Sequence, residues 1–436
     1  MQIIIDQLIA DFHEQELPDL TRRQERLPWI PGKTDTVIGM RRSGKTWFLY
    51  QVMRELLQDG LPAEALLYLN FEDERLMPIT TSDLQQIPDT FYRRYPHLKD
   101  RQCVYFFDEI QNVLGWELFV RRLLDSENAH ICLTGSSSRL LSSEIATSLR
   151  GRSLTTEIFP FNFAEFLEHG GIDSRLDKHP GSKRRAVLEN RLSAYLDVGG
   201  FPEVQALKRE YRIRVLQEYL DVVVLRDLVE RYGISNVAAL RYMIRHLLNC
   251  PASLFSVQKF YNDLKFQGVP CGKNTLHQFF DYLADAYLFF PVCIHSNSER
   301  TRMVNPRKVY TVDTGMIRAC SRSTSPDWGH LLENFVFMEL RRRTGQIEYY
   351  RTENGREVDF YATELSGKIS LIQSAASMQD KKTAEREINA LSEAMEECGA
   401  AEASIVSFNT EKHLDTNSGL IHIIPAWKWA LSHAQG

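Results

Sequence analysis

A run of small and polar residues near the start of the sequence has the spacing of a phosphate-binding loop. The stretch GMRRSGKT places Gly39, Gly44, Lys45 and Thr46 in the pattern GxxxxGK[ST]. In such a loop backbone N–H groups surround the β-phosphate, the lysine meets the β- and γ-phosphate oxygens, and the hydroxyl ligates Mg²⁺. Glycine at the two fixed positions lets the backbone approach the phosphates closely. The spacing therefore predicts a site for ATP and Mg²⁺.

The whole loop and the first turn of the helix after it are predicted to contact the nucleotide. At most one of the two arginines is expected to touch it, because both stand at variable positions of the pattern. The predicted nucleotide-binding residues are Gly39, Arg41, Arg42, Ser43, Gly44, Lys45, Thr46 and Trp47.

An acidic pair follows a second hydrophobic strand. In CVYFFDEIQ the apolar run Val104 to Phe107 ends at Asp108 and Glu109. Strand ends beside a phosphate-binding loop are where a parallel sheet presents its functional side chains. Asp108 suits the Mg²⁺ shell with Thr46, and Glu109 suits the base that polarises an attacking water. Glu109 and Lys45 are thus predicted catalytic residues.

Alternating strand and helix patterns surround these residues. TDTVI precedes the loop, KTWFLYQVMRELLQDG follows it as a helix that ends near Gly60, and ALLYLNFED, HICLTGSSSRL and LTTEIFP have the composition of further strands. A helix is expected around Glu117–Leu124. This alternation predicts an α/β fold with a parallel sheet covered on both faces. Thr134 and Ser136, after the fourth strand, suit either γ-phosphate contacts or turn formation, and both alternatives stay open.

The motifs GMRRSGKT, NFED, FFDEIQ, LTGSSSRLL and LRGRSLTTEIFPFNFAEFL together resemble the AAA-type ATPase domain of a broad bacterial and archaeal ATP-binding family whose C-terminal module is uncharacterised. The resemblance continues in GGFPEV, LRDLVERYGI, VYTVDTG, LLENFVFMEL and EVDF, and so covers nearly the whole chain. It implies a five-stranded core with the P-loop strand central, and ATP as the ligand.

Two arginines in LRGRSL, Arg150 and Arg152, follow the fourth strand. An arginine finger accelerates phosphoryl transfer by neutralising charge, and one supplied by another subunit makes activity depend on assembly. Arg152 is the predicted finger. The alternative is a structural arginine paired with a carboxylate.

Composition shifts divide the chain into four predicted segments. A helical extension covers residues 1–32, an AAA-type P-loop domain covers 33–170, a helical and winged-helix region covers 187–320, and a small nuclease-like α/β domain covers 328–436. A polar stretch with Pro and Gly, residues 172–186, separates the second and third segments.

The third segment contains a winged-helix candidate. Two helical stretches flank a Gly/Pro turn, and the strand KVYTVD follows. The second helix is expected to begin near Lys273 and to present Asn274, Thr275, His277 and Gln278 to DNA. Phosphate contacts are expected from Lys259, Lys265, Arg300, Arg302, Arg307 and Lys308. The alternative is a lid or a protein-contact module, since apolar residues fill the helices and aspartates dilute the positive charge.

The last segment resembles the PD-(D/E)xK nuclease core in its α-β-β-β-α-β order. Glu333 and Asp359 stand where that family places metal carboxylates, but Gln373, Ser374 and Ala375 replace the E-x-K step. A neutral amide is a weaker Mg²⁺ ligand than a carboxylate, and alanine cannot orient a water as lysine does. A nuclease-like fold without nuclease activity is therefore expected.

Composition narrows the class of protein. The net charge is −5, and the seven cysteines form no CxxC pair, which predicts neither a disulfide framework nor a zinc site. No apolar run approaches the roughly 20 residues of a membrane span, and the first residues lack a secretory pattern. A cytoplasmic protein without membrane contact is expected.

These observations favour a Mg²⁺-dependent ATPase whose ATP and ADP states control C-terminal modules that bind DNA or an unidentified protein partner, with assembly into an oligomer as an option. Two alternatives remain. One is a nucleotide-regulated DNA-binding or signalling switch with negligible turnover, and the other is an ATPase-regulated nuclease.

Overall fold

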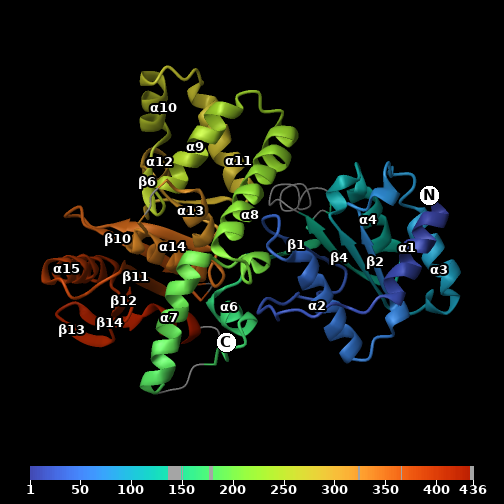
Figure 1. The fold of residues 1–436 in the computed structure, drawn as a ribbon, viewed down its shortest axis with the longest axis horizontal. Coiled ribbons are helices and arrows are strands. Elements are labelled where there is room, and N and C mark those ends of the chain that lie inside the picture. The colour runs from blue at the N-terminus through green and yellow to red at the C-terminus, as the bar shows by residue number, and fades with distance from the viewer. Residues whose placement is uncertain (136–148, 150, 176–179, 323–324, 365, 433–436) are drawn as a thin grey trace. The chain divides into compact units, whose positions relative to one another are not determined.

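The structure, a computed structural model, describes residues 1–135, 149, 151–175, 180–322, 325–364 and 366–432. The chain divides into two units (Figure 1). Unit 1 comprises Met1–Phe159 with Asp285–Tyr287, and unit 2 comprises Pro160–Ala284 with Leu288–Gly436.

Unit 1 is built on a parallel sheet. Its elements are α1 (Gln2–Glu14), β1 (Thr34–Ile38), α2 (Lys45–Gln58), β2 (Leu66–Asn70), α3 (Gln86–Arg94), β3 (Cys103–Asp108), α4 (Trp116–Ser126), β4 (Ala129–Gly135) and β5 (Ser153–Glu157). The five strands pair in parallel in the order β2-β3-β4-β1-β5. The predicted strands and the parallel sheet are confirmed. The expectation that the P-loop strand is central is wrong, because β4 holds the middle position and β1 lies between β4 and β5.

Helices cover both faces of this sheet, as the alternation of side chains along β3 makes visible. Val104 and Phe106 belong to one hydrophobic cluster with Phe48 of α2. On the other face Tyr105 contacts Phe91 of α3, with ring centroids 5.6 Å apart. Successive strand residues point to opposite faces, so a strand buried throughout needs helices on both sides. Asp108 comes two residues after Phe106, so its side chain points to the same face of the sheet, toward α2.

Unit 2 begins with helices. These are α6 (Phe163–His169), α7 (Ser182–Val198), α8 (Arg209–Val222) with a π-helical continuation (Val223–Glu230), and α9 (Val237–Asn249). There follow β6 (Ser253–Phe255), α10 (Val257–Phe266), α11 (Lys273–Asp285), β7 (Phe289–Val292), α12 (Glu299–Val304), β8 (Arg307–Thr311) and α13 (Thr314–Cys320). Strands β6, β8 and β7 form an antiparallel sheet in that order.

The rest of unit 2 is a mixed sheet with helices. It contains α14 (Trp328–Arg341), β9 (Gln346–Arg351), β10 (Glu357–Thr363), β11 (Ile369–Ala375), α15 (Lys381–Cys398), β12 (Glu402–Ser407), β13 (Lys412–Thr416), β14 (Gly419–Pro425) and α16 (Ala426–Ser432). The strand order is β13-β14-β12-β11-β10-β9. The predicted α-β-β-β-α-β order of elements is present from α14 to β12, and Asp380 caps α15 by accepting a hydrogen bond from Thr383 N.

Two motifs that lie far apart in the sequence meet in unit 2. The buried Asp313 carboxylate of VYTVDTG accepts a hydrogen bond from Gly200 N of GGFPEV at 2.6 Å and caps α13 through Met316 N at 3.1 Å. A β-carbon on Gly199 would lie 2.1 Å from Asp313 Oδ1, and φ at Gly199 is +79°. The glycines of this motif therefore let the backbone close around a buried carboxylate.

We expect Asp313 to make the protein less stable as the pH rises from about 4 to about 6. Burial raises the pKa of Asp313 from 3.8 to about 6. In that window the folded state binds the proton and the unfolded state does not, so the free energy of unfolding falls with pH, by up to about 3 kcal/mol. Between pH 4 and 6 the melting temperature of the wild type should fall relative to that of Asp313→Asn. Above pH 6 the difference between the two melting temperatures should stay constant. Parallel curves would contradict the assignment.

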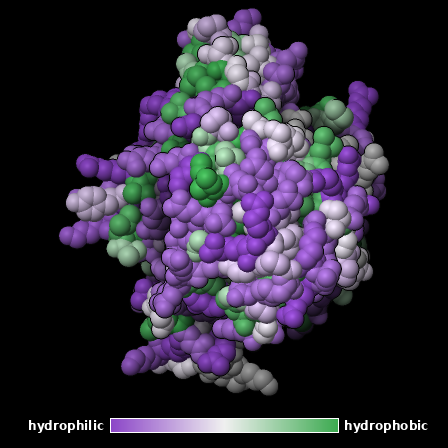
Figure 2. Space-filling view, turned by 90° about the vertical axis from the view of Figure 1, so that its right-hand side faces the viewer, coloured by the Kyte–Doolittle hydropathy of each residue, from purple (hydrophilic) through white to green (hydrophobic). Residues whose placement is uncertain are grey.

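The surface is predominantly polar on the face drawn in Figure 2, where hydrophobic residues occur in small separate groups. Among the residues that the structure describes, no helix is both long and apolar enough to span a bilayer.

Candidate functional site

The loop between β1 and α2 depends on its two predicted glycines. At Gly39, where φ is +150°, a β-carbon would lie 2.1 Å from the carbonyl oxygen of Ile158. Gly44 has φ of +100°, and α2 begins at the next residue. Arg42 also adopts a left-handed conformation, with φ of +65°. The backbone of this loop and the N-terminus of α2 therefore form the kind of site at which backbone N–H groups bind phosphate.

The ammonium group of Lys45 is folded back onto the loop. Its Nζ donates to Gly39 O at 3.1 Å and to Met40 O at 3.3 Å, and lies 3.6 Å from Glu109 Oε1. The side chain is only 5% exposed. A buried cation held mainly by backbone carbonyls is a group that an anionic ligand can attract strongly.

Asp108 lies at the centre of a hydrogen-bonded group. Its Oδ2 accepts from Thr46 Oγ1 at 2.8 Å and from Tyr68 OH at 3.0 Å, and its Oδ1 accepts from Thr134 Oγ1. Burial raises the pKa of Asp108, and these hydrogen bonds oppose the increase. The fold therefore places a hydroxyl and a carboxylate, both hard oxygen ligands, side by side next to the loop.

Glu109 is held in a particular backbone conformation. It has φ of +53° and ψ of +43°, and its N–H donates to Thr134 Oγ1 at 2.9 Å. Gln111 Nε2 donates to Glu109 Oε2. A non-glycine residue in the left-handed region costs free energy, and such conformations concentrate at functional sites. The conformation turns Glu109 toward Lys45.

Other predicted nucleotide contacts lie around the loop. Arg41 pairs with Glu72 at 3.0 Å, Arg42 is exposed, and the ring of Trp47 is half exposed. Ser43 is fully buried, and its carbonyl accepts from Arg23 Nη2 at 3.1 Å. The structure brings the loop, Asp108 and Glu109 together, whereas the two arginines lie at its rim.

Arg152 is not near this site within the chain. It directly precedes β5, whose first residue Ser153 pairs with Thr34 at the start of β1, whereas the loop follows the end of β1. Five residues of strand, about 16 Å, separate these edges. Arg152 Nη1 is paired with Asp125. Arg150 and Ser136 lie outside the described residues.

Two residues at the site had no sequence signal that predicted their role. Tyr68 reaches Asp108 from the neighbouring strand β2, and burial together with the charge of Asp108 raises the pKa of its phenol. Arg23 supports the loop from the segment before β1 through Ser43 O and Phe159 O. Both contacts depend on how separate segments pack, which spacing along the chain does not encode.

Glu333 and Asp359, the two carboxylates predicted to bind metal in the last segment, are also brought together, but around a lysine. Lys308 Nζ lies 2.9 Å from Glu333 Oε1 and 2.8 Å from Asp359 Oδ1. The prediction that Lys308 contacts DNA phosphates is wrong, since its side chain is 5% exposed and bound by carboxylates. Gln373 is occupied by Asp359 N at 3.0 Å and by Glu387 at 2.7 Å.

The predicted DNA-facing residues of α11 differ from Lys308 in exposure. Asn274, His277 and Gln278 are exposed, Thr275 is intermediate, and Lys273, the first residue of the helix, is exposed too. Of the predicted phosphate contacts, Lys259, Lys265 and Arg300 are exposed, whereas Arg302 pairs with Glu348 at 2.7 Å. Arg307 lies over the Phe280 ring, 6.0 Å from its centroid.

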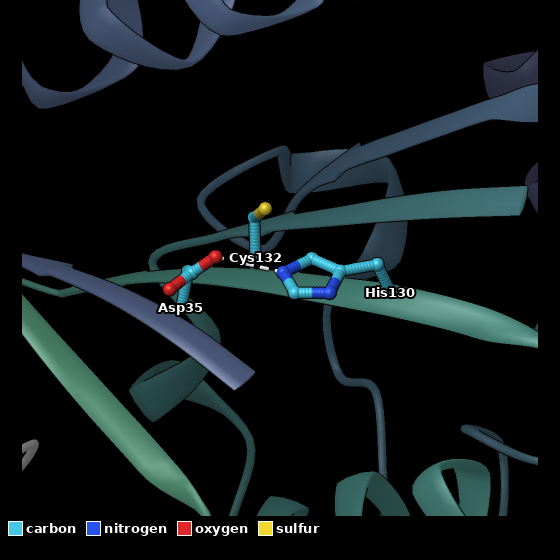
Figure 3. Close-up of side chains that lie close together, drawn as sticks. All are labelled: Asp35, His130 and Cys132. Carbon is cyan, nitrogen blue, oxygen red and sulfur yellow. Dashed lines mark hydrogen bonds and ion pairs between the residues drawn. The ribbon is translucent and has the colours of Figure 1, made fainter. Parts of the chain in front are cut away.

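A separate buried group lies at the opposite end of the parallel sheet (Figure 3). His130 Nε2 is 2.7 Å from Asp35 Oδ2, and the Cys132 thiol lies beside them. Ligand atoms of the three residues lie within 4.8 Å of one another, so the group could hold a metal ion such as Zn²⁺. The ring of Trp29 lies 4.5 Å from that of His130 at an interplanar angle of 41°, and the backbone N–H of Trp29 donates to Asp35 Oδ2 at 3.3 Å. The His130–Asp35 pair thus anchors the segment that leads into β1.

Comparison with known proteins agrees with the geometry of the loop. Residues 32–167 match the family described as AAA domain (AAA_14), residues 189–327 match a domain of unknown function (DUF8612), and residues 328–429 match another (DUF4143). Fold, site and match together define the class: this is an AAA-type P-loop protein, ATPase-like and nucleotide-binding.

The chain belongs to the same family as the uncharacterized protein MJ1544 of Methanocaldococcus jannaschii. The two are 35% identical over 444 aligned positions that cover 99% of this chain and 96% of the relative. An uncharacterized protein of Haemophilus influenzae is 31% identical and is matched over 75% of this chain and 78% of its own length.

Two solved structures that match this chain have TM-scores below 0.5. The Aeropyrum pernix ORC1 protein in complex with DNA has a TM-score of 0.30 and 14% identity, covering 66% of this chain and 86% of its own. Cdc6p from Pyrobaculum aerophilum has a TM-score of 0.25 and 13% identity, covering 73% and 91%.

Proposed function

We propose that this protein is a Mg²⁺-dependent ATPase whose nucleotide state controls its C-terminal modules. The observation that carries the proposal is the meeting of the loop with the acidic pair: Thr46 Oγ1 donates to Asp108 at 2.8 Å while Lys45 lies 3.6 Å from Glu109. A loop that only bound nucleotide would need no carboxylate positioned to polarise water.

The residues at the site fit Mg²⁺ and ATP. Thr46 and Asp108 would hold the metal, because Mg²⁺ prefers a small number of hard oxygen ligands from protein together with phosphate oxygens. Mg²⁺ would neutralise charge on the phosphates. Gly39 lets the loop pack against Ile158, because a β-carbon there would lie 2.1 Å from Ile158 O.

The chain's own residues have separate proposed roles. Backbone N–H groups of residues 41–46 bind phosphate, and Lys45 exchanges its carbonyl partners Gly39 and Met40 for phosphate oxygens. That exchange releases Glu109, whose carboxylate then orients the attacking water and takes up its proton. Thr134 Oγ1 donates to Asp108 and accepts from Glu109 N, and so fixes the positions of the two acidic residues relative to each other.

Arg152 can serve as a finger only in another copy of the chain. It lies at the edge of the sheet opposite the loop, and 46% of its side chain is exposed. We therefore propose an oligomer if Arg152 takes part, and a structural ion pair with Asp125 otherwise. Specific activity that rises with protein concentration would distinguish the first case from the second.

The modules under control are proposed to be residues 187–320 and 328–436, attached to the P-loop domain of residues 33–170 and its extension, residues 1–32. Binding of ATP rather than ADP would favour one arrangement through different contacts in the two states. An unidentified protein partner or DNA would sense that arrangement.

The direct test is Mg²⁺-dependent release of phosphate from ATP by the purified chain, with EDTA as the metal-free control. Turnover that requires Mg²⁺ supports the ATPase. Tight ATP binding with no turnover at any protein concentration would contradict it and favour a nucleotide-held switch.

A second candidate role, DNA binding, is supported by the order of elements from α9 to β8. The elements run helix, strand, two helices, strand, short helix α12 and strand, and the three strands form one antiparallel sheet, an order similar to that of a winged helix. Its second helix, α11, keeps Lys273, Asn274, His277 and Gln278 exposed, as a groove-reading face requires.

We expect Lys273→Glu/His277→Glu to weaken duplex DNA binding about tenfold or more, because two exposed groups at the start of α11 change to acidic ones. Electrophoretic mobility shifts at two salt concentrations would measure this. Lys381→Glu, at the exposed start of α15, is the matched control and should leave binding unchanged. Equal binding by all three proteins would remove α11 from the DNA-binding hypothesis.

We also propose that the segment 328–436 is nuclease-like in fold without nuclease activity. Gln373 is engaged by Asp359 N and Glu387, and Ala375 is buried in the hydrophobic core. Release of nucleotides from DNA that depends on Asp359 would contradict this proposal.

A further inference from the structure

A second cluster of charge, remote in sequence from the phosphate-binding loop, is buried inside unit 2. Lys308 of β8 places its Nζ 2.9 Å from Glu333 Oε1, 2.9 Å from Glu357 Oε1 and 2.8 Å from Asp359 Oδ1. These carboxylates, here called the carboxylate cage, come from α14 and β10. An ammonium group has three N–H donors, so each carboxylate receives one.

Burial separates this cluster from an ordinary surface ion pair. The exposed fractions are 5% for Lys308, 12% for Glu333 and 8% for Asp359, while Glu357 at the rim is 30% exposed. Ion pairs on a surface contribute little because water screens them, whereas a buried charge without a partner is strongly destabilising. The cage therefore requires a cation.

The cage also holds more negative than positive charge. Three carboxylates face one ammonium, and Arg351 Nη2 lies 3.6 Å from Glu357 Oε2. Burial and then the charge of Asp359 raise the pKa of Glu333 to about 8. Burial alone would lower the pKa of Lys308, but the carboxylates outweigh it and raise that pKa well above its usual range. Lys308 thus stays charged.

Contacts on both sides fix the position of Lys308. Asn334 of α14 bonds the backbone of Thr311 twice, accepting from its N at 2.8 Å and donating to its O at 2.9 Å. Before Lys308, the Pro306 carbonyl accepts from Tyr349 OH at 2.8 Å. Strand β8 is therefore held against α14 and β9, and its lysine enters the cage from a defined direction.

Two further donors orient the carboxylates of the cage. Tyr310 OH donates to Glu333 Oε1 at 2.9 Å, and Ser374 N donates to Asp359 Oδ2 at 2.8 Å. Three oriented carboxylates around one point are a set of hard oxygen ligands suited to a divalent cation. Metal–oxygen distances of about 2.1 Å would need the oxygens to move inward by less than 1 Å from their places around the ammonium.

We propose that the carboxylate cage is a cation site whose resident cation is the ammonium group of Lys308, and that this lysine excludes a divalent metal ion and joins β8 to the C-terminal sheet. Loss of the ammonium opens the cage to a cation of the Mg²⁺ and Mn²⁺ class. The proposal is independent of the P-loop site, and it explains why the metal carboxylates of a nuclease-like fold are present without a metal-dependent activity being expected.

The test is titration of the nucleotide-free, full-length chain with Mn²⁺, followed by the electron paramagnetic resonance signal of the free ion. Lys308→Ala is expected to gain one bound Mn²⁺ per chain relative to the wild type. Lys308→Ala/Asp359→Asn is expected to lose that ion, while its phosphate-binding loop with Asp108 is unchanged. Mn²⁺ is also expected to raise the melting temperature of Lys308→Ala and leave that of the wild type unchanged.

Folding of the variants is part of the same test. If Lys308→Ala does not fold, the same Mn²⁺ titration is made with Lys308→Ala/Glu333→Gln, which has one buried carboxylate fewer. A wild type that binds a Mn²⁺ ion dependent on Asp359 would overturn the proposal, because Lys308 would then not exclude the metal. Absence of a gained ion in both Lys308 variants, or failure of both to fold even with Mn²⁺ present, would overturn it equally.

Discussion

Glu109→Gln is expected to lower the turnover of ATP by about 10²–10⁴-fold while ATP still binds. Glutamine keeps the size of the side chain and its place beside Lys45, 3.6 Å away in the wild type, but it cannot accept a proton from water. Because Glu109 N remains bonded to Thr134, the backbone of the site should not change. Phosphate release and binding of a fluorescent ATP analogue would be measured on the same preparation.

A matched variant controls for the loss of one negative charge near the site. Glu117→Gln lies in the first turn of α4, beyond the acidic pair, and should leave turnover unchanged. If Glu109→Gln retains more than about a tenth of wild-type turnover, Glu109 is not the general base. Loss of ATP binding in this variant would instead indicate a structural role.

Replacing Lys45 by Ala should weaken ATP binding about 30-fold or more and abolish turnover. Loss of one partner of a buried, hydrogen-bonded charge pair costs about 2–5 kcal/mol, and Lys45 is the buried cation of the loop. The carbonyls of Gly39 and Met40, which bind Nζ in the nucleotide-free state, are backbone groups, so their loss of a donor should not unfold the loop. Isothermal titration with ATP and Mg²⁺ would measure the affinity.

The matched control for this variant is Lys33→Ala. Lys33 stands just before β1, at the opposite end of the strand from the loop, and its Nζ donates to Gly151 O at 3.4 Å. It should bind ATP as the wild type does. Equal affinities of Lys45→Ala and the wild type would contradict the assignment of the loop as the nucleotide site, whatever the turnover.

Much of the secondary structure was predictable because it is encoded by local pattern. The run TDTVI is β-branched and forms β1, and the helix predicted to end near Gly60 ends at Gln58. The helix expected near Lys273 begins there as α11. The order of the strands was not predictable, and the P-loop strand lies beside the centre of the sheet rather than at it, because pairing between strands is decided by packing.

Charge illustrates the limit of local reasoning. From the sequence, Lys308 was a predicted phosphate contact and Lys273 marked the expected start of the DNA-facing helix, and both are basic residues near the end of a helix or strand. In the fold Lys273 is exposed, whereas Lys308 is surrounded by Glu333, Glu357 and Asp359. Their difference arises from residues more than 20 positions away, which no spacing rule relates to Lys308.

The sequence by itself determined the class of chemistry, because the loop from Gly39 to Thr46 is contiguous and its function depends on backbone geometry that glycine permits. Only the tertiary structure decided which side chains surround that loop and which cation fills the carboxylate cage. Tyr68 and Thr134 reach Asp108 from neighbouring strands, and Lys308 reaches its acids from another sheet. The physical reason is that hydrogen bonds and buried charges depend on distances in space, which the chain acquires only when its segments pack together.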